Sequence, residues 1–190
     1  MRKKLITAVI ALTLVLTSLV GVTVAWLSVN TDPVTNTFSP SNIGLTLTET
    51  ERTYKMVPGT EIAKDPKVTV TNDIDCYVFV KVAKTTNFDT YMTYRIAGGW
   101  SEVTSAADGD YKVYYREVKA DDNNKTFSVL DGDKVVVPNT VTKTDMDKLY
   151  DTNGAVVTAN QPKMTFTAYA IQKTGFATAA EAWAEAQKLG

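Results

Sequence analysis

Short segments in which apolar and polar residues alternate recur along most of this chain, and they constrain its fold more than any other feature. Between Asn42 and Thr50, Ile43, Leu45 and Leu47 alternate with glycine and threonines. Such alternation places successive side chains on opposite faces and predicts a half-buried strand. Similar or strongly β-forming patterns predict further strands at Val68–Thr71, Tyr77–Val82, Tyr91–Ile96, Tyr111–Val118, Thr126–Leu130, Val135–Val137 and Met164–Gln172.

Turn-forming residues separate these segments. Pro58-Gly59 and Asp131-Gly132 predict turns, and Asp121–Asn124 predicts the tip of a hairpin that joins Tyr111–Val118 to Thr126–Leu130. The segment Thr142–Tyr150 is ambiguous and could form a helical turn. Many short strands without regular strand–helix alternation predict a mainly β fold, specifically a jelly-roll-like antiparallel β-sandwich.

One helix is expected near the end of the chain. Thr178 is a suitable N-cap, and Glu181 stands three residues later, as in a capping box. The alanine-rich stretch Ala179–Leu189 follows, with Trp183 as its large apolar residue. The expected fold is therefore a β-sandwich with one short C-terminal helix.

The first 25 residues have the composition of an export signal. Arg2, Lys3 and Lys4 precede Leu5–Ala25, which carries no charge. The small residues Thr23 and Ala25 predict cleavage before Trp26 and a secreted or cell-surface location. The uncharged run could also cross a bilayer of about 30 Å as a helix, so an uncleaved membrane anchor remains an alternative.

The sequence therefore predicts that the chain has three parts. Residues 1–25 form the signal peptide, residues 26–40 an extended N-terminal arm rich in polar and helix-breaking residues, and residues 41–190 the β-sandwich domain. Fully extended, the arm could span about 50 Å at about 3.3 Å per residue. It could reach a neighbouring subunit, fold back on its own domain or stay disordered.

Composition excludes several function classes. The chain has no histidine, so histidine-based catalytic sites and histidine zinc sites cannot be built. The single cysteine, Cys76, lies in an apolar run and is expected to be a core residue. The formal net charge of -1 becomes more negative once the basic residues of the signal are removed, which disfavours nucleic acid as a partner. We expect no enzymatic activity, cofactor or metal.

Carboxylate pairs and tyrosines leave two further alternatives. The acidic pairs suit either calcium binding or solvated turns, and the second reading fits better because none has the spacing of a calcium loop. A pair of carboxylates placed across a cleft would be needed for glycoside hydrolysis, and no such placement is indicated. The tyrosines could form a sugar-binding face or cross-strand pairs. The acidic pairs are Asp73/Asp75, Asp108/Asp110, Asp121/Asp122 and Asp131/Asp133, and the tyrosines are Tyr91, Tyr94, Tyr111, Tyr114 and Tyr115.

The order of several stretches resembles the TasA and camelysin (CalY) family of secreted proteins from Gram-positive bacteria. The stretches are Val22–Leu27 with Asn36-Thr37-Phe38, then Met56–Gly59, Lys64-Asp65-Pro66, Val68–Asn72 and Tyr77–Val82, then Gly99-Trp100, Tyr114-Tyr115, Val135–Pro138, Thr167–Gln172 and Ala182-Trp183. The resemblance covers most of the chain, and the order of the stretches is more specific than any one of them.

This resemblance implies a structural protein of surface or biofilm-matrix fibres. It implies cleavage between Ala25 and Trp26 by a signal peptidase of the SipW type, with Thr23 and Ala25 at the small positions before the cut. It also implies linkage of subunits by donation of an N-terminal strand. The residues implied in strand donation are Asn36, Phe38, Ile43, Leu45 and Leu47. The metalloprotease activity described for camelysin-type members is not carried over, because the chain has no histidine. The first alternative is a monomeric cell-surface binding module on an uncleaved anchor, and the second is a secreted protease.

Overall fold

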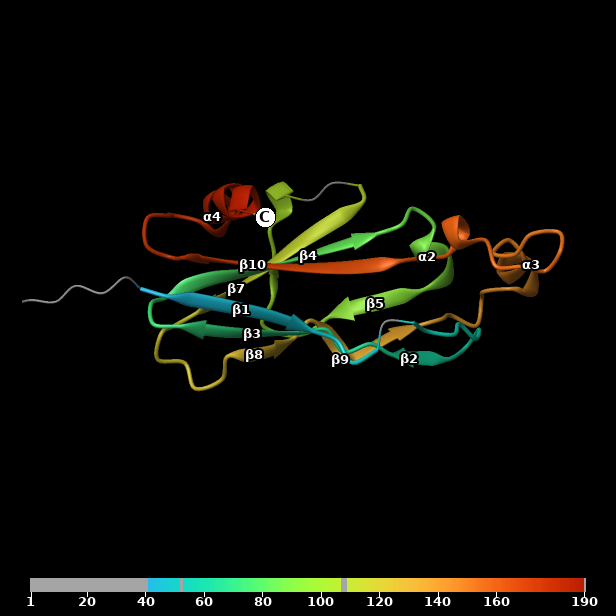
Figure 1. Cartoon of the computed structure of the whole chain (residues 1–190), viewed down its shortest axis with the longest axis horizontal. Coiled ribbons are helices and arrows are strands. Elements are labelled where there is room, and N and C mark those ends of the chain that lie inside the picture. Colours follow the sequence, from blue (N-terminus) through green and yellow to red (C-terminus); the bar gives the residue numbers. More distant parts are fainter. Residues whose placement is uncertain (1–40, 52, 107–108, 190) are drawn as a thin grey trace, which may run out of the picture. The chain divides into compact units, whose positions relative to one another are not determined.

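The described part of the chain is mainly β, with antiparallel sheets and few helices (Figure 1). The computed structural model describes residues 41–51, 53–106 and 109–189. The chain divides into two units, Met1–Ser39 and Pro40–Gly190, and the description below concerns the second. The expected signal peptide and N-terminal arm lie outside the described residues.

The first sheet has the strand order β1-β3-β8. Strand β1 (Ile43–Thr48) pairs antiparallel with β3 (Lys67–Asn72), and β3 pairs with β8 (Thr126–Ser128). The alternation predicted for β3 is confirmed, because Val68 and Val70 are buried whereas Thr71 is exposed.

The second sheet has the order β10-β4-β7-β6. Its strands are β10 (Met164–Gln172), β4 (Cys76–Lys84), β7 (Tyr111–Val118) and the short β6 (Ser101–Glu102). The apolar run in β4 predicted an interior strand. β4 does lie between β10 and β7, pairing with β10 over its full length and with β7 from Cys76 to Ala83.

A third sheet, with the order β2-β9-β5, contains two features that the sequence did not indicate. Strand β2 (Glu61–Ala63) was not predicted. Strand β9 (Leu130–Val136) contains Asp131-Gly132, so the turn predicted there is wrong. The register between β9 and β5 (Thr93–Ile96) jumps at this point, and Gly132 and Asp133 have φ of 65° and 50°. The turn-forming residues make an irregularity within the strand, in which residues 131–134 stand opposite Arg95, and they do not separate two strands.

The predicted hairpin between Tyr111–Val118 and Thr126–Leu130 is also wrong. β7 pairs with β4 and β6, whereas β8 pairs with β3 in the other sheet. The chain therefore crosses between sheets after β7. At the end of this crossing, just before β8, the Lys125 carbonyl accepts a hydrogen bond from Val70 N of β3 over 2.8 Å. Turn residues show where a chain changes direction but not which strand it then joins.

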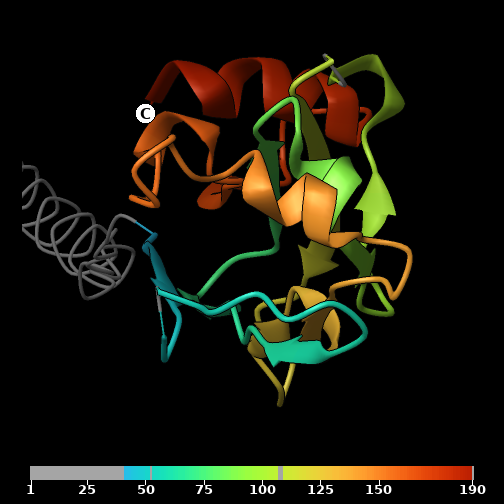
Figure 2. The ribbon, with the colours of Figure 1, turned by 90° about the vertical axis from the view of Figure 1, so that its right-hand side faces the viewer.

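The first two sheets pack across a shared apolar core. Val68 and Val70 of β3 lie in one cluster with Val78, Val80 and other residues of β4. The opposite face of β4 is covered by α4 (Ala179–Ala186), whose Trp183 ring lies 5.4 Å from the Phe79 ring. In Figure 2, α4 lies at the top of the molecule and β2 at the bottom.

Short helices complete the fold. α3 (Lys143–Asp147) has Thr142 as N-cap in a full capping box, which resolves the ambiguous segment as helical. α2 (Phe88–Tyr91) ends at Tyr91, the first residue of the segment predicted as strand, and both Phe88 and Tyr91 are buried. The strand itself begins at Thr93. The described residues also form the 3₁₀ segments η1 (Thr104–Ala106), η2 (Thr158–Asn160) and η3 (Gln187–Leu189).

The predicted C-terminal helix is present, with one difference at its start. Thr178 accepts a hydrogen bond from Glu181 N, as expected of the N-cap. The Glu181 carboxylate accepts from Ala177 N rather than from Thr178 N. The cap is therefore made one residue further out than a standard capping box.

Candidate functional site

Strand β1 leaves one row of main-chain groups unpaired within the described structure. Asp73 N donates to Asn42 O over 3.3 Å, which sets the phase of the β1–β3 ladder. In an antiparallel pair, alternate residues direct their N–H and C=O groups to the partner. The main-chain groups of Ile43, Leu45 and Leu47 therefore point away from β3, toward the edge of the sheet.

The same phase argument applies to β10, the edge strand of the second sheet. Thr85 N donates to Lys163 O over 3.0 Å at one end of the ladder, and Lys173 N donates to Asp75 O over 2.9 Å at the other. Odd-numbered residues of β10 consequently bond to β4. The residues whose main-chain groups face the open edge are Met164, Phe166, Ala168 and Ala170.

These two open edges lie next to each other. Cα atoms of β1 and β10 approach within 8 Å, yet no ladder joins the two strands. We call the boundary between β1 and β10 the seam. The other edge strands of the described sheets, such as β6 and β8, are much shorter. A long unpaired edge is the surface that most readily accepts another strand.

Apolar side chains along the seam are incompletely covered. Leu45 of β1 and Ala168 of β10 pack against the shared core but remain only half-buried. The same holds for the other core-facing residues of the two strands, Ile43, Leu47, Phe166 and Ala170. In contrast, Val78 and Val80 in the middle of the second sheet are fully buried. The core is therefore closed in its centre and open along the seam.

A hollow lies at each end of the seam. The first, of about 520 Å³, is lined by the start of β1 and the end of β10, including Ser41, Ile43 and Ala170. The second, of about 340 Å³, is lined by the start of β10 and by the segment that follows β1. We call the second the methionine hollow, because Met56, Met92 and Met164 line it.

An ion pair with little exposure borders the methionine hollow. Lys64 Nζ lies 2.5 Å from Glu49 Oε1, and their side chains are 10% and 17% exposed. The ammonium also lies 5.0 Å from the centre of the Tyr54 ring and 5.3 Å from that of Phe166. The Tyr54 hydroxyl donates to Glu49 over 3.0 Å. Burial and this hydrogen bond raise the pKa of Tyr54, so the phenol stays protonated and neutral. The counter-charge of Lys64 is the Glu49 carboxylate.

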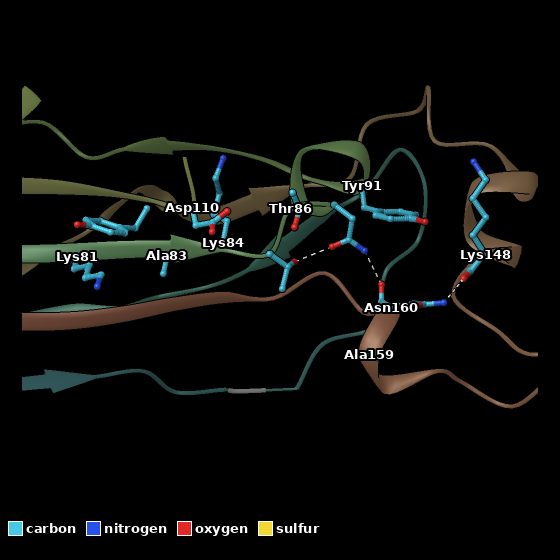
Figure 3. Close-up of a pocket in the computed structure, with 12 residues that line it drawn as sticks. Lys81, Ala83, Lys84, Thr86, Tyr91, Asp110, Lys148, Ala159 and Asn160 are labelled. Carbon is cyan, nitrogen blue, oxygen red and sulfur yellow. Dashed lines mark hydrogen bonds between the residues drawn. The ribbon is translucent and has the colours of Figure 1, made fainter. Parts of the chain in front are cut away.

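A third pocket is polar and lies on the outer face of the second sheet (Figure 3). Its volume is about 580 Å³. A chain of hydrogen bonds crosses one end: Thr85 Oγ1 donates to Asn87 Oδ1, Asn87 Nδ2 to Asn160 O, and Asn160 Nδ2 to Lys148 O. These groups connect three segments of the fold, so their first role is structural.

The charges in this polar pocket are largely balanced. Lys84 pairs with Asp89 over 2.7 Å and Lys148 with Asp145 over 2.9 Å. The ammonium of Lys81 lies 4.1 Å from the centre of the Tyr111 ring, so it covers the ring face that a sugar would need. The pocket therefore has neither a strong net charge nor an open aromatic platform.

Several residues singled out from the sequence have structural roles. Asp73 accepts from Asn42 N, and Asp75 accepts from Ala120 N, which supports the turn reading. Within the described ranges, no group of three or more acidic or cysteine residues could hold a metal ion. Cys76 is fully buried, and burial raises its pKa to about 11.

The tyrosines do not form one exposed face. Tyr91 is 3% exposed and Tyr114 is 9% exposed, so both belong to the core. The Tyr115 ring packs edge-on against the Tyr77 ring at 6.1 Å. The cross-strand interpretation of these aromatic residues therefore fits their positions better than a sugar-binding face.

The predicted cleavage and donation residues fall in two groups. Thr23, Ala25, Trp26, Asn36 and Phe38 lie outside the described residues. Those in β1 are Ile43, Leu45 and Leu47, which pair with β3 of the same chain and line the seam. Across residues 41–51, 53–106 and 109–189, the structure contains no helix long and apolar enough to span a membrane.

Sequence reasoning missed the β10 side of this site. Phe166, Ala168 and Ala170 do alternate with threonines and a tyrosine, so their common face was readable. Nothing in that pattern shows that β10 is an edge strand or that it lies beside β1. No family model, curated protein or solved structure matches this chain.

Proposed function

We propose that this chain is a secreted, non-enzymatic structural protein whose subunits link head to tail into fibres of the cell surface or biofilm matrix. In this proposal the domain is a jelly-roll-like antiparallel β-sandwich, residues 1–25 are removed by a signal peptidase of the SipW type, and residues 26–40 are donated to the next subunit. The observation that carries the proposal is the seam, with two long, adjacent and unpaired strand edges.

The seam offers what an added strand requires. Main-chain groups of β1 and β10 face the boundary, so an extended peptide could satisfy them by hydrogen bonds. The half-buried apolar residues of both strands would gain cover at the same time. Strand β1 is already paired with β3 of its own chain, and the main-chain groups of Ile43, Leu45 and Leu47 point to the seam. In this proposal these three residues therefore belong to the accepting edge and not to the donated strand.

Insertion requires the seam to widen. A strand placed between two others needs roughly 9.6 Å between its neighbours, twice the usual strand spacing. Cα atoms of β1 and β10 come closer than this, within 8 Å. We therefore expect the seam of the free subunit to be too narrow for an added strand and to widen when it accepts the arm.

Because each subunit both donates and accepts, the contact is heterologous and produces filaments rather than closed dimers. The test compares mature protein beginning at Trp26 with protein beginning at Ser41. Light scattering and electron microscopy should show fibres for the first and monomers for the second, with the same β-type circular dichroism spectrum. Equal fibre formation by both proteins would refute strand donation.

A further inference from the structure

The two ends of the seam differ in chemistry and in their relation to the chain. At one end, Ser41 and Ile43 mark the point at which the chain enters β1 from the N-terminal arm. At the other end, Met164 begins β10, and Tyr54 and Met56 follow β1, forming the methionine hollow. The arm therefore leaves its own domain at the Ser41 end of the seam, and the methionine hollow lies at the opposite end.

This asymmetry determines the direction in which an arm would enter its neighbour. In a head-to-tail filament all subunits have the same orientation along the axis. If the seam follows that axis, an arm that leaves its own domain at the Ser41 end reaches the neighbouring seam at the opposite end, the methionine hollow. The part of the arm closest to its own domain then lies at this hollow, and Trp26 lies deepest in the seam.

Phe38 is the large apolar residue of the arm closest to β1. The methionine hollow suits an aromatic ring. Thioethers are flexible and polarizable and make favourable contacts with aromatic rings. The rings of Tyr54 and Phe88 also line the hollow, and its volume of about 340 Å³ has room for a side chain of this size. Lys64 at its border is already paired with Glu49. Lys163, the other charged residue of the lining, is exposed, so its ammonium can stay in water while an apolar group enters.

We infer that the methionine hollow of one subunit receives the Phe38 side chain of the next subunit, which sets the polarity of the fibre. This inference rests on the proposed strand donation and adds the point of entry and the anchoring residue. Its test must therefore separate the direction of entry from donation itself.

Cysteine pairs in the full chain, exported and processed by its host, provide that test. Ser39→Cys lies beside Phe38 and preserves it. Thr53→Cys lies on the methionine hollow, and Gln172→Cys lies on the other hollow; both replaced residues are exposed. The variants Ser39→Cys/Thr53→Cys and Ser39→Cys/Gln172→Cys form matched pairs, treated as fibres with a short bismaleimide. Cys76 is fully buried and does not interfere.

The inference predicts a ladder of covalent multimers on a denaturing gel for the pair with Thr53→Cys, and loss of that ladder for the pair with Gln172→Cys and for each single variant. A ladder from the pair with Gln172→Cys would overturn the direction of entry while leaving strand donation intact. Fibres without a ladder from either pair would overturn the inference alone. Failure of the unmodified protein to form fibres would overturn both proposals.

A second measurement tests the anchoring residue. Phe38→Ala should slow elongation at least tenfold, whereas Phe38→Met should retain most of the rate, because a thioether also packs among methionines. Thr37→Ala, on the neighbouring position of the arm, is the matched control and should elongate normally. Equal rates for Phe38→Ala and Thr37→Ala would overturn the role of Phe38.

Discussion

The Lys64 ammonium and the Glu49 carboxylate form the least exposed ion pair among the described residues, with 2.5 Å between Nζ and Oε1. The pair joins Lys64, the residue that follows β2, to the segment after β1, and Lys64 lines one border of the methionine hollow. Its position gives it a larger effect on stability than the exposed pairs have, because both charges have lost most of their contact with water.

Removal of one partner should therefore be costly. We expect Glu49→Ala to lower the free energy of unfolding by about 3 kcal/mol, because Lys64 is left nearly buried without a counter-charge. The double change Glu49→Leu with Lys64→Met should restore most of that loss, since it removes both charges. Urea denaturation measures each value. The control is Lys143→Ala, whose exposed pair with Asp147 should contribute less than about 0.5 kcal/mol.

Proline substitutions distinguish the two faces of β10's main chain. The N–H of Ala168 points to the seam, whereas that of Thr167 bonds to β4. Ala168→Pro should leave a folded domain that no longer elongates fibres, because an incoming strand loses a hydrogen-bond donor. Thr167→Pro should instead destabilise the domain itself. Thermal unfolding and light scattering separate these effects, and normal elongation by Ala168→Pro would contradict a role for this edge.

The buried thiol predicts a pH dependence of stability. Burial raises the pKa of Cys76 from 9.0 to about 11. Above pH 9 the unfolded chain loses this proton while the folded chain keeps it, so stability should fall between pH 9 and pH 11, by up to about 1.4 kcal/mol per pH unit. Cys76→Ala should remove this component. Burial also raises the pKa of Tyr94, to about 12, but this tyrosine affects both proteins equally.

The proposed export signal leads to the simplest prediction. Intact mass of the protein recovered from the medium and cell surface should correspond to a chain that begins at Trp26. A charged, bulky residue in place of Ala25 should leave precursor in the membrane. Recovery of surface protein that still carries residues 1–25 would favour the monomeric module on an uncleaved anchor.

Local patterns in the sequence determined the type and position of most elements. Alternation identified β1 and β3, the aromatic and β-branched run identified β7, and Thr178 placed the start of α4. These features depend on residues close together in the chain. They set backbone preference and the face that each side chain occupies, and both can be read without knowledge of the partner strand.

Only the tertiary structure decided which strands are neighbours. The chain crosses to the other sheet after β7 instead of turning back as a hairpin, and the Asp131-Gly132 pair lies in an irregularity within β9. The position of β10 beside β1, and hence the seam, follows from the packing of Val68 and Val70 against the second sheet. Strand pairing depends on contacts between distant segments, and many partners satisfy the same alternating pattern; the closing of a shared core selects among them.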